Sequence, residues 1–149
     1  MDTPDVAPAV EAWAVIAVPA LNSYDEAPQE LALALPLVIA ELALEAVGNF
    51  ASAVFSEASN YQQTFLRAWT VDLTIMSTPT PEWTASRPLY QYVDALGKAL
   101  RAGVKLGDDM VMSQFYTANF VPAEIEYEDG TRVRQVTMTL TLGSMIGAG

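Results

Sequence analysis

Two segments of this chain alternate apolar and polar residues so regularly that each is expected to form a strand with one buried face. In the segment 64–76, the apolar positions are Trp69, Val71, Leu73 and Ile75. In the segment 131–142, they are Val136, Met138, Leu140 and Leu142. Successive side chains of a strand point to opposite faces, so both segments offer one face to a core and one to water. A half-buried β-sheet is therefore the predicted framework.

Two further segments have the three- and four-residue apolar spacing of helices that pack on a sheet. The first covers residues 5–18 and stops before Pro19, with an apolar stripe of Val6, Val10, Trp13, Ala14 and Ala17. The second covers residues 86–102, with Ser86 as a candidate N-cap and Gly103 as its end. Its stripe is Leu89, Tyr92, Val93, Leu96 and Leu100.

The remaining strands are predicted at residues 35–46 and 119–127. The first choice is the harder one, because Ala, Leu and Glu in 31–47 favour a helix while Pro36 and the run 37–39 favour a strand. The second strand would join 131–142 through Glu128-Asp129-Gly130, since Asp-Gly is a strong hairpin signal. The predicted fold class is α+β, a single domain over 1–149 with an antiparallel or mixed sheet of about four strands and two helices packed on it.

Long loops are expected near residues 19–30 and 46–63, followed by a flexible tail at 143–149. The loop near 19–30 combines two prolines with small polar residues. The loop near 46–63 carries Phe50, Val54 and Phe55 among turn-forming residues, and these apolar side chains would be exposed on a monomer.

The residue types that are missing exclude many kinds of chemistry. The chain has no cysteine and no histidine, which removes disulfides, thiolate nucleophiles, imidazole bases and the usual zinc ligands. The carboxylates left as catalytic candidates are Asp108, Asp109, Glu124, Glu126, Glu128 and Asp129. Turn capping and solvent exposure explain them better than acid–base or metal chemistry. We therefore predict no catalytic residue, no cofactor and no metal site, and a protein that is not an enzyme.

Charge is distributed unevenly along the chain. The net charge is −11, and no Lys or Arg precedes Arg67, whereas nine of the 18 acidic residues do. This asymmetry indicates either a solvated face or a surface that repels an anion, and it argues against binding to phosphates or anionic membranes. The longest apolar run, 31–40, has about half of the ~20 residues that a membrane span needs. The start of the chain is acidic where a signal peptide needs basic residues, which predicts a protein that is cytoplasmic when made.

The order of the elements, with some local patterns, resembles the tail terminator (tail-completion) proteins of long-tailed double-stranded DNA bacteriophages. The resemblance rests on the apolar strand with proline near its start (35–42), the strand that follows an arginine (67–75), the amphipathic helix after it, and the ending 127–130 into 136–142. It spans about residues 5–142 and is one of pattern and order rather than of a diagnostic motif.

The resemblance implies a structural virion protein at the head-proximal end of the tail. Such a protein forms a homo-hexameric ring that ends tube polymerisation and joins the tail tube protein to the neck and connector proteins. A neck or head-completion protein of the same virion is an alternative, as is a small-ligand or peptide-binding module that uses the aromatic residues. An enzyme that uses only carboxylates is a third alternative.

Within a ring, two groups of residues would acquire roles. Phe50, Val54 and Phe55 are the candidate subunit-interface arm. The candidate acidic lumen consists of Asp25, Glu26, Glu30, Glu41 and Glu45. Like charges repel over about a Debye length, roughly 8 Å at physiological salt, so DNA would pass through an acidic lumen without specific binding. A lumen lined instead by Lys98, Arg101 and Lys105 would contradict this hypothesis.

Overall fold

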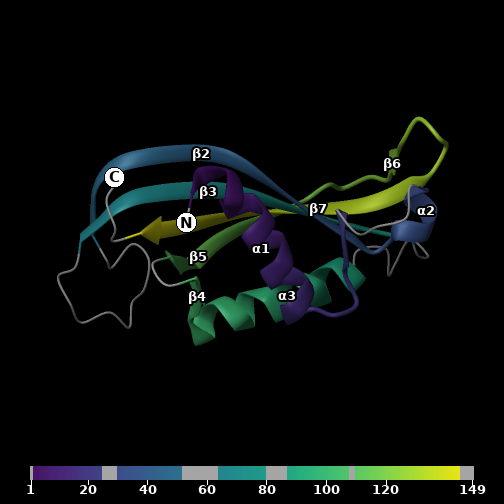
Figure 1. Cartoon of the computed structure of the whole chain (residues 1–149). Helices are drawn as coiled ribbons and strands as arrows, with labels where there is room; N and C mark the ends of the chain where they lie inside the picture. Colours follow the sequence, from purple (N-terminus) through teal and green to yellow (C-terminus); the bar gives the residue numbers. More distant parts are fainter. Residues whose placement is uncertain (1, 25–29, 52–63, 80–86, 108–109, 145–149) are drawn as a thin grey trace.

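A computed structural model describes residues 2–24, 30–51, 64–79, 87–107 and 110–144. Over this part of the chain the protein forms three helices and seven strands (Figure 1). The helices are α1 (Thr3–Ala17), α2 (Leu31–Ala34) and α3 (Arg87–Ala102). The strands are β1 (Asn22–Ser23), β2 (Leu37–Ala51), β3 (Thr64–Ser77), β4 (Val104–Leu106), β5 (Met110–Phe120), β6 (Ile125–Glu126) and β7 (Arg132–Ser144).

The strands form one twisted mixed sheet in the order β1-β2-β3-β7-β5-β4, with β6 added beside β7. All pairs are antiparallel except β1 with β2, which are parallel. The prediction of about four strands and two helices was therefore wrong. Reading the sequence located α1, β2, β3, α3 and β7, but it missed β1, β4, α2 and most of β5.

The strand predicted at 119–127 lies mainly earlier in the chain, as β5. Met110 and Met112 of β5 face the core, and an irregularity between Met112 and Tyr116 then shifts the register. After it, Tyr116 and Phe120 again pack against the core. Four steps along β5, from Met112 to Tyr116, stand against two along β7, from Leu142 to Leu140, so the two extra residues leave Met112 and Tyr116 on the same side. The polar Gln114 and the exposed Phe115 inside this irregularity interrupt the apolar–polar pattern that identifies a strand in a sequence. Only residues 119–120 and the two residues of β6 coincide with the predicted strand.

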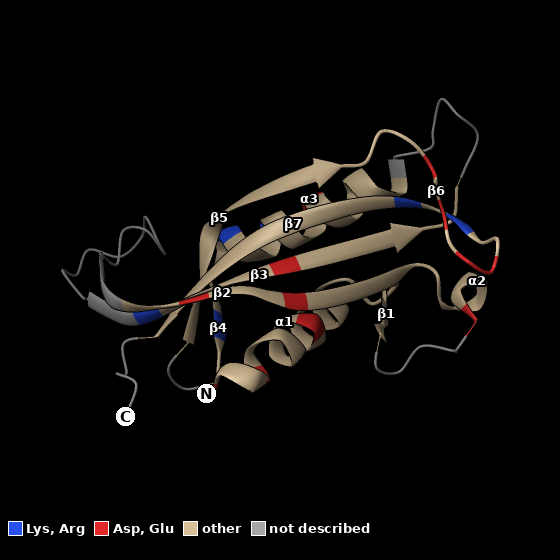
Figure 2. Ribbon diagram, turned by 90° about the horizontal axis from the view of Figure 1, so that it is seen from above, with Lys and Arg blue, Asp and Glu red and all other residues tan. Residues whose placement is uncertain are grey.

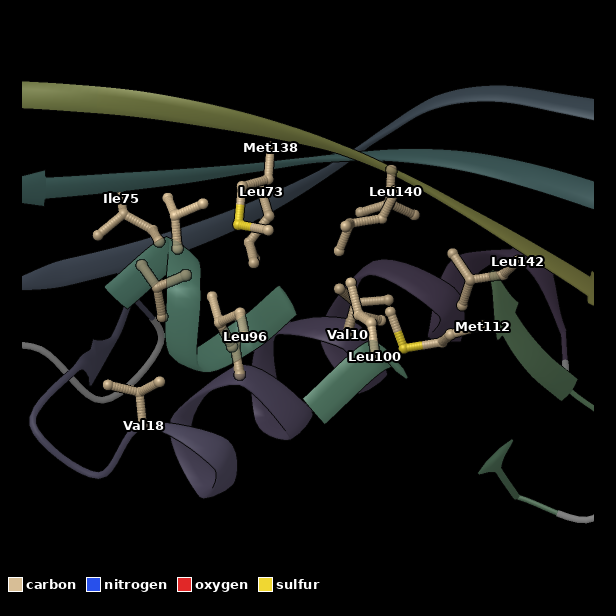
Figure 3. Close-up of a cluster of buried hydrophobic side chains, with 14 of the residues drawn as sticks. Val10, Val18, Leu73, Ile75, Leu96, Leu100, Met112, Met138, Leu140 and Leu142 are labelled. Atoms are coloured by element: carbon tan, nitrogen blue, oxygen red, sulfur yellow. The ribbon is translucent and has the colours of Figure 1, made fainter. Parts of the chain in front are cut away.

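The hydrophobic core lies between the sheet and two helices, α1 and α3, which cover the same face of the sheet (Figure 1). Val10 of α1 and Leu96 and Leu100 of α3 point towards Leu73 and Leu140 of the sheet (Figure 3). These side chains are at most 1% exposed. Each contributes roughly 1.5–3 kcal/mol of transfer free energy when it is fully buried, so this layer holds the domain together.

The segment 31–51, whose residues favour both helix and strand, forms a short helix followed by a strand. Helix α2 occupies only Leu31–Ala34, and Leu35 is already extended, with φ −74° and ψ 142°. The residue before a proline avoids the helical region, so Pro36 ends the helix and leaves the apolar run after it to form β2. The predicted strand at 35–46 is thus confirmed in type, with later bounds.

The predicted loops are shorter in the structure. Strand β2 continues to Ala51 and pairs with β3 through to Thr64, so residues 46–51 are not loop and the backbone of Phe50 pairs with that of Phe65. Val54 and Phe55 lie outside the described residues. The loop near 19–30 contains β1, and its residues 25–29 also lie outside the description. Gly143 and Ser144, expected in a flexible tail, are buried members of β7.

The turn predicted at Asp129-Gly130 is confirmed. Gly130 has φ +84°, a left-handed conformation that suits glycine. The Thr131 amide donates to Asp129 Oδ1 at 2.9 Å. This backbone N–H bond stabilises the charged form and lowers the pKa of Asp129. The local turn chemistry therefore fixes the β6–β7 hairpin.

Candidate functional site

One face of the sheet is covered by neither α1 nor α3 (Figure 1). Strand register lines this face mostly with threonine. It is built from alternate residues of two neighbouring strands: Thr70, Asp72, Thr74, Thr137, Thr139 and Thr141. Thr139 Oγ1 donates to Asp72 Oδ1 at 3.2 Å, and the hydroxyls of Thr74 and Thr137 are 3.3 Å apart. These bonds between side chains bind the strands together and leave a polar, half-buried surface, called the threonine face below.

The threonine face carries two negative charges near its middle. Glu41 of β2 lies directly opposite Asp72 of β3 (Figure 2). The strand segments 37–46, 70–76 and 135–141 contain no Lys or Arg. Like charges opposite one another weaken a sheet by a fraction of a kcal/mol, so this pair opposes the stability of the isolated fold. The face is suited to repel an anion rather than to bind one.

The structure does not bring the candidate acidic lumen residues together on one face. Glu41 lies on the threonine face, whereas Glu45 lies opposite Trp69 and therefore on the face that the helices cover. A register irregularity between Leu42 and Leu44 causes this change of side. Glu30 is exposed just before α2. Asp25 and Glu26 fall outside the described residues.

Glu45 belongs to a polar cluster at the start of α1. Arg67 Nη2 donates to Glu45 Oε1 at 2.7 Å and to Thr3 Oγ1 at 2.7 Å. Thr3 donates to the same Glu45 oxygen at 2.8 Å, and Trp69 Nε1 donates to Thr3 at 3.3 Å. The Arg67 guanidinium lies over the Trp69 ring, 4.8 Å from its centroid. The cluster fastens α1 to β2 and β3.

The cluster should make part of the stability depend on pH. Hydrogen bonds from Arg67 and then Thr3 lower the pKa of Glu45 below its ordinary value. A carboxylate with a lowered folded-state pKa stabilises the fold above its unfolded-state pKa, and this contribution disappears as the pH falls through the folded-state pKa. We expect Glu45→Gln to unfold at lower urea than the wild type at pH 7, with the difference closing as the pH falls through the folded-state pKa of Glu45.

The control for this prediction is Glu45→Gln in an Arg67→Met background. Without the guanidinium, the substitution should change the urea midpoint much less at pH 7 and show little pH dependence. An equal effect of Glu45→Gln in both backgrounds would show that the ion pair does not stabilise the fold.

A buried carboxylate that the sequence did not single out connects α1 to the sheet edge. Glu11 is 6% exposed. Ser23 Oγ of β1 donates to Glu11 Oε2 at 2.8 Å, and the Ala40 amide of β2 approaches Oε1 at 3.4 Å. A pocket of about 250 Å³ lies beside it, lined by Ala7, Pro8, Glu11, Tyr24, Ile39, Ala40 and Glu41. Glu11 follows Val10 of the apolar stripe in the sequence, and nothing in the pattern distinguishes it from an exposed acid.

The edge of the sheet formed by β2 is largely unpaired by the described residues. Strand β1 pairs only with Leu37 and Val38, and the Ala40 amide faces Glu11. Beyond that point, Leu44 and Val47 are 59% and 67% exposed, and Leu42 is also exposed. Exposed apolar residues on an open strand edge are typical of a surface that another chain covers.

The carboxylates considered for catalysis do not form a site in the described part of the chain. Glu124 makes an exposed ion pair of 3.5 Å with Arg132, and Asp108 and Asp109 lie outside the description. Among the described residues, no three acidic side chains are grouped as metal ligands would be. Nor does any described helix have the length and apolarity to cross a membrane.

Comparison with known proteins does not assign the chain to a family. No protein-family model matches it, and no curated protein matches its sequence. The function must therefore be argued from the surfaces described above.

Proposed function

We propose that this protein is a structural virion subunit, the tail terminator of a long-tailed bacteriophage. It forms a homo-hexameric ring at the head-proximal end of the tail tube, in which it ends tube polymerisation and joins the tube to the neck and connector proteins. The protein acts in the assembled virion, after synthesis in the host cytoplasm. It acts by packing and has no catalytic activity.

The observation that carries this proposal is that one subunit has both an open apolar edge and a sheet face whose central charges are all negative. The exposed Leu42 and Val47, which lie opposite Val71 and Arg67 and so on the side away from the threonine face, give β2 a surface that a neighbouring subunit would bury. The threonine face, with Glu41 and Asp72, is the surface that passing DNA would meet. A wall of hydroxyls and carboxylates lets a polyanion slide without adhering, because binding to DNA depends on ammonium and guanidinium groups that neutralise its phosphates.

The pocket beside Glu11 does not favour a small-ligand module equally well. Its volume of about 250 Å³ is below the roughly 300–1,000 Å³ of ordinary ligand pockets. Its charged groups are Glu11, already bonded to Ser23, and Glu41. A ring subunit accounts for the exposed apolar edge, which a monomeric binding module would leave without a role.

Electron microscopy of the purified protein, alone and mixed with purified tail tubes, tests the proposal. We expect six-fold rings of tail-tube diameter, or a single ring that caps one end of each tube. A protein that stays monomeric at all concentrations and does not bind tube ends would overturn the proposal. Rings that bind isolated heads but not tubes would indicate the neck protein instead.

A further inference from the structure

The two edges of the sheet, each taken with its neighbouring helix and called a side below, carry opposite charges. The side formed by the start of α1 and by β2 bears Asp2 and Asp5, both exposed, and the chain has no Lys or Arg before Arg67. The side formed by α3 and β4 bears the exposed Lys98, Arg101 and Lys105, with Asp94 as the one exposed acid of the described part of α3 (Figure 2). Strand order separates these groups, since β3, β7 and β5 lie between β2 and β4.

The acidic start of α1 and the basic β4 also lie at the same height along the strands. Strand register places Ala46 of β2 in one row with Ala68, Gly143, Val111 and Lys105 of the successive strands. Thr3, next to Asp2 at the start of α1, bonds Glu45, which is one residue from Ala46. The acidic start of α1 and the basic β4 therefore occupy matching positions at opposite sides of one subunit.

Both sides present apolar surface as well. The acidic side exposes Leu42 and Val47 of β2, and the basic side exposes Phe115 of β5, which is 49% exposed. Strand β4 pairs with β5 only at residues 110–112, so the described strands leave the rest of that edge unpaired, as they do on β2. A surface that combines an open edge, apolar side chains and one sign of charge fits a partner with the opposite sign.

We propose that a second copy of this chain docks head to tail, with its α3–β4 side on the α1–β2 side of the first. This inference rests on the proposed ring, and it specifies which surfaces meet. A contact between two different surfaces of the same protein can repeat around an axis, and it closes into a ring where its rotation allows and otherwise grows into a filament, whereas a contact of like surfaces stops at a dimer. Two α1–β2 sides would bring acid against acid, so charge disfavours that dimer.

Charge reversal in two separate variants tests the arrangement. The acidic-side variant carries Asp2→Lys and Asp5→Lys, and the basic-side variant carries Arg101→Glu and Lys105→Glu. All four side chains are exposed, and Asp2 makes no side-chain cap hydrogen bond to α1. The variants should therefore fold, which circular dichroism and urea unfolding would verify.

Sedimentation velocity then distinguishes the outcomes. We expect each variant alone to associate at least tenfold more weakly than the wild type, because like charges meet at every contact. An equimolar mixture should recover wild-type assembly. In the mixture, the two variants alternate and meet at two kinds of contact. At one, the lysines introduced in the first variant face the glutamates introduced in the second. At the other, the unchanged α3–β4 side of the first variant meets the unchanged α1–β2 side of the second. Assembly of the wild type should weaken as salt is raised, since salt screens exposed charges.

Three results would overturn the inference. If both variants formed rings as the wild type does, the ring would stand but these sides would not be its contact. If the variants failed alone and the mixture failed too, the head-to-tail pairing would be wrong while wild-type rings in the microscope still supported the function. If the wild type neither self-associated nor bound tail tubes, the inference and the proposed function would both fall.

Discussion

Replacing Trp69 by alanine should destabilise the fold by about 3–5 kcal/mol, the range for removing a large aromatic side chain from a core. Trp69 is 1% exposed and lies on β3 opposite Leu142 of β7. Its loss would leave a cavity beneath α1 and remove the surface on which the Arg67 guanidinium rests. Urea unfolding at fixed protein concentration measures the effect, since self-association makes the apparent stability depend on concentration.

The matched control is Trp69→Phe. Phenylalanine keeps much of the apolar volume but has no indole N–H for Thr3, so we expect a loss of about 1–2 kcal/mol. A loss below about 1 kcal/mol for Trp69→Ala would show that the helices do not pack on the sheet as described.

Removing the Glu11 carboxylate should cost about 2 kcal/mol, because the Ser23 hydroxyl and the Ala40 amide would both lose their acceptor. The bond to Ser23 is the stronger one, because its 2.8 Å is shorter than the 3.4 Å between the Ala40 amide and Glu11. The expected order of destabilisation is Glu11→Ala, then Ser23→Ala, then Glu11→Gln, since glutamine keeps one carbonyl oxygen. Urea midpoints of the three variants give this order.

Amide hydrogen exchange separates the two roles of Glu11. Exchange at Ala40 should accelerate in Glu11→Ala but not in Ser23→Ala, because only the first removes the acceptor of that amide. Unchanged protection of Ala40 in Glu11→Ala would contradict a capping role for Glu11 at the open edge of β2.

Local sequence patterns predicted those helices, strands and turns whose conformation depends mainly on residues close together in the chain. Strands β3 and β7 alternate regularly over 69–75 and 136–142, α3 has a clear apolar stripe, and Asp129-Gly130 forms the predicted turn. Strand β5 was missed because the polar Gln114 and the exposed Phe115, at its irregularity, interrupt the apolar–polar pattern. Strands β1 and β4 have two and three residues, too few for any pattern, and they form because a partner strand is already in place.

The candidate surfaces, too, were predictable from the sequence only in part. The charge asymmetry before Arg67 was visible in the sequence. Its separation to opposite sides of one sheet was not, because strand order depends on contacts between residues far apart in the chain. The candidate acidic lumen is divided between two faces for a similar reason, since a single irregularity in β2 turns Glu45 away from Glu41.

The sequence by itself determined that this chain lacks cysteine and histidine chemistry and builds a half-buried sheet with helices on one face. Residue types and short-range periodicity are sufficient for that, because they decide which side chains must leave water. Only the tertiary structure decided that most of β2 is an open edge, that Glu11 is buried, and that the acidic start of α1 and the basic β4 lie at the same height. Those properties arise from pairing and packing between distant segments, which no local pattern contains.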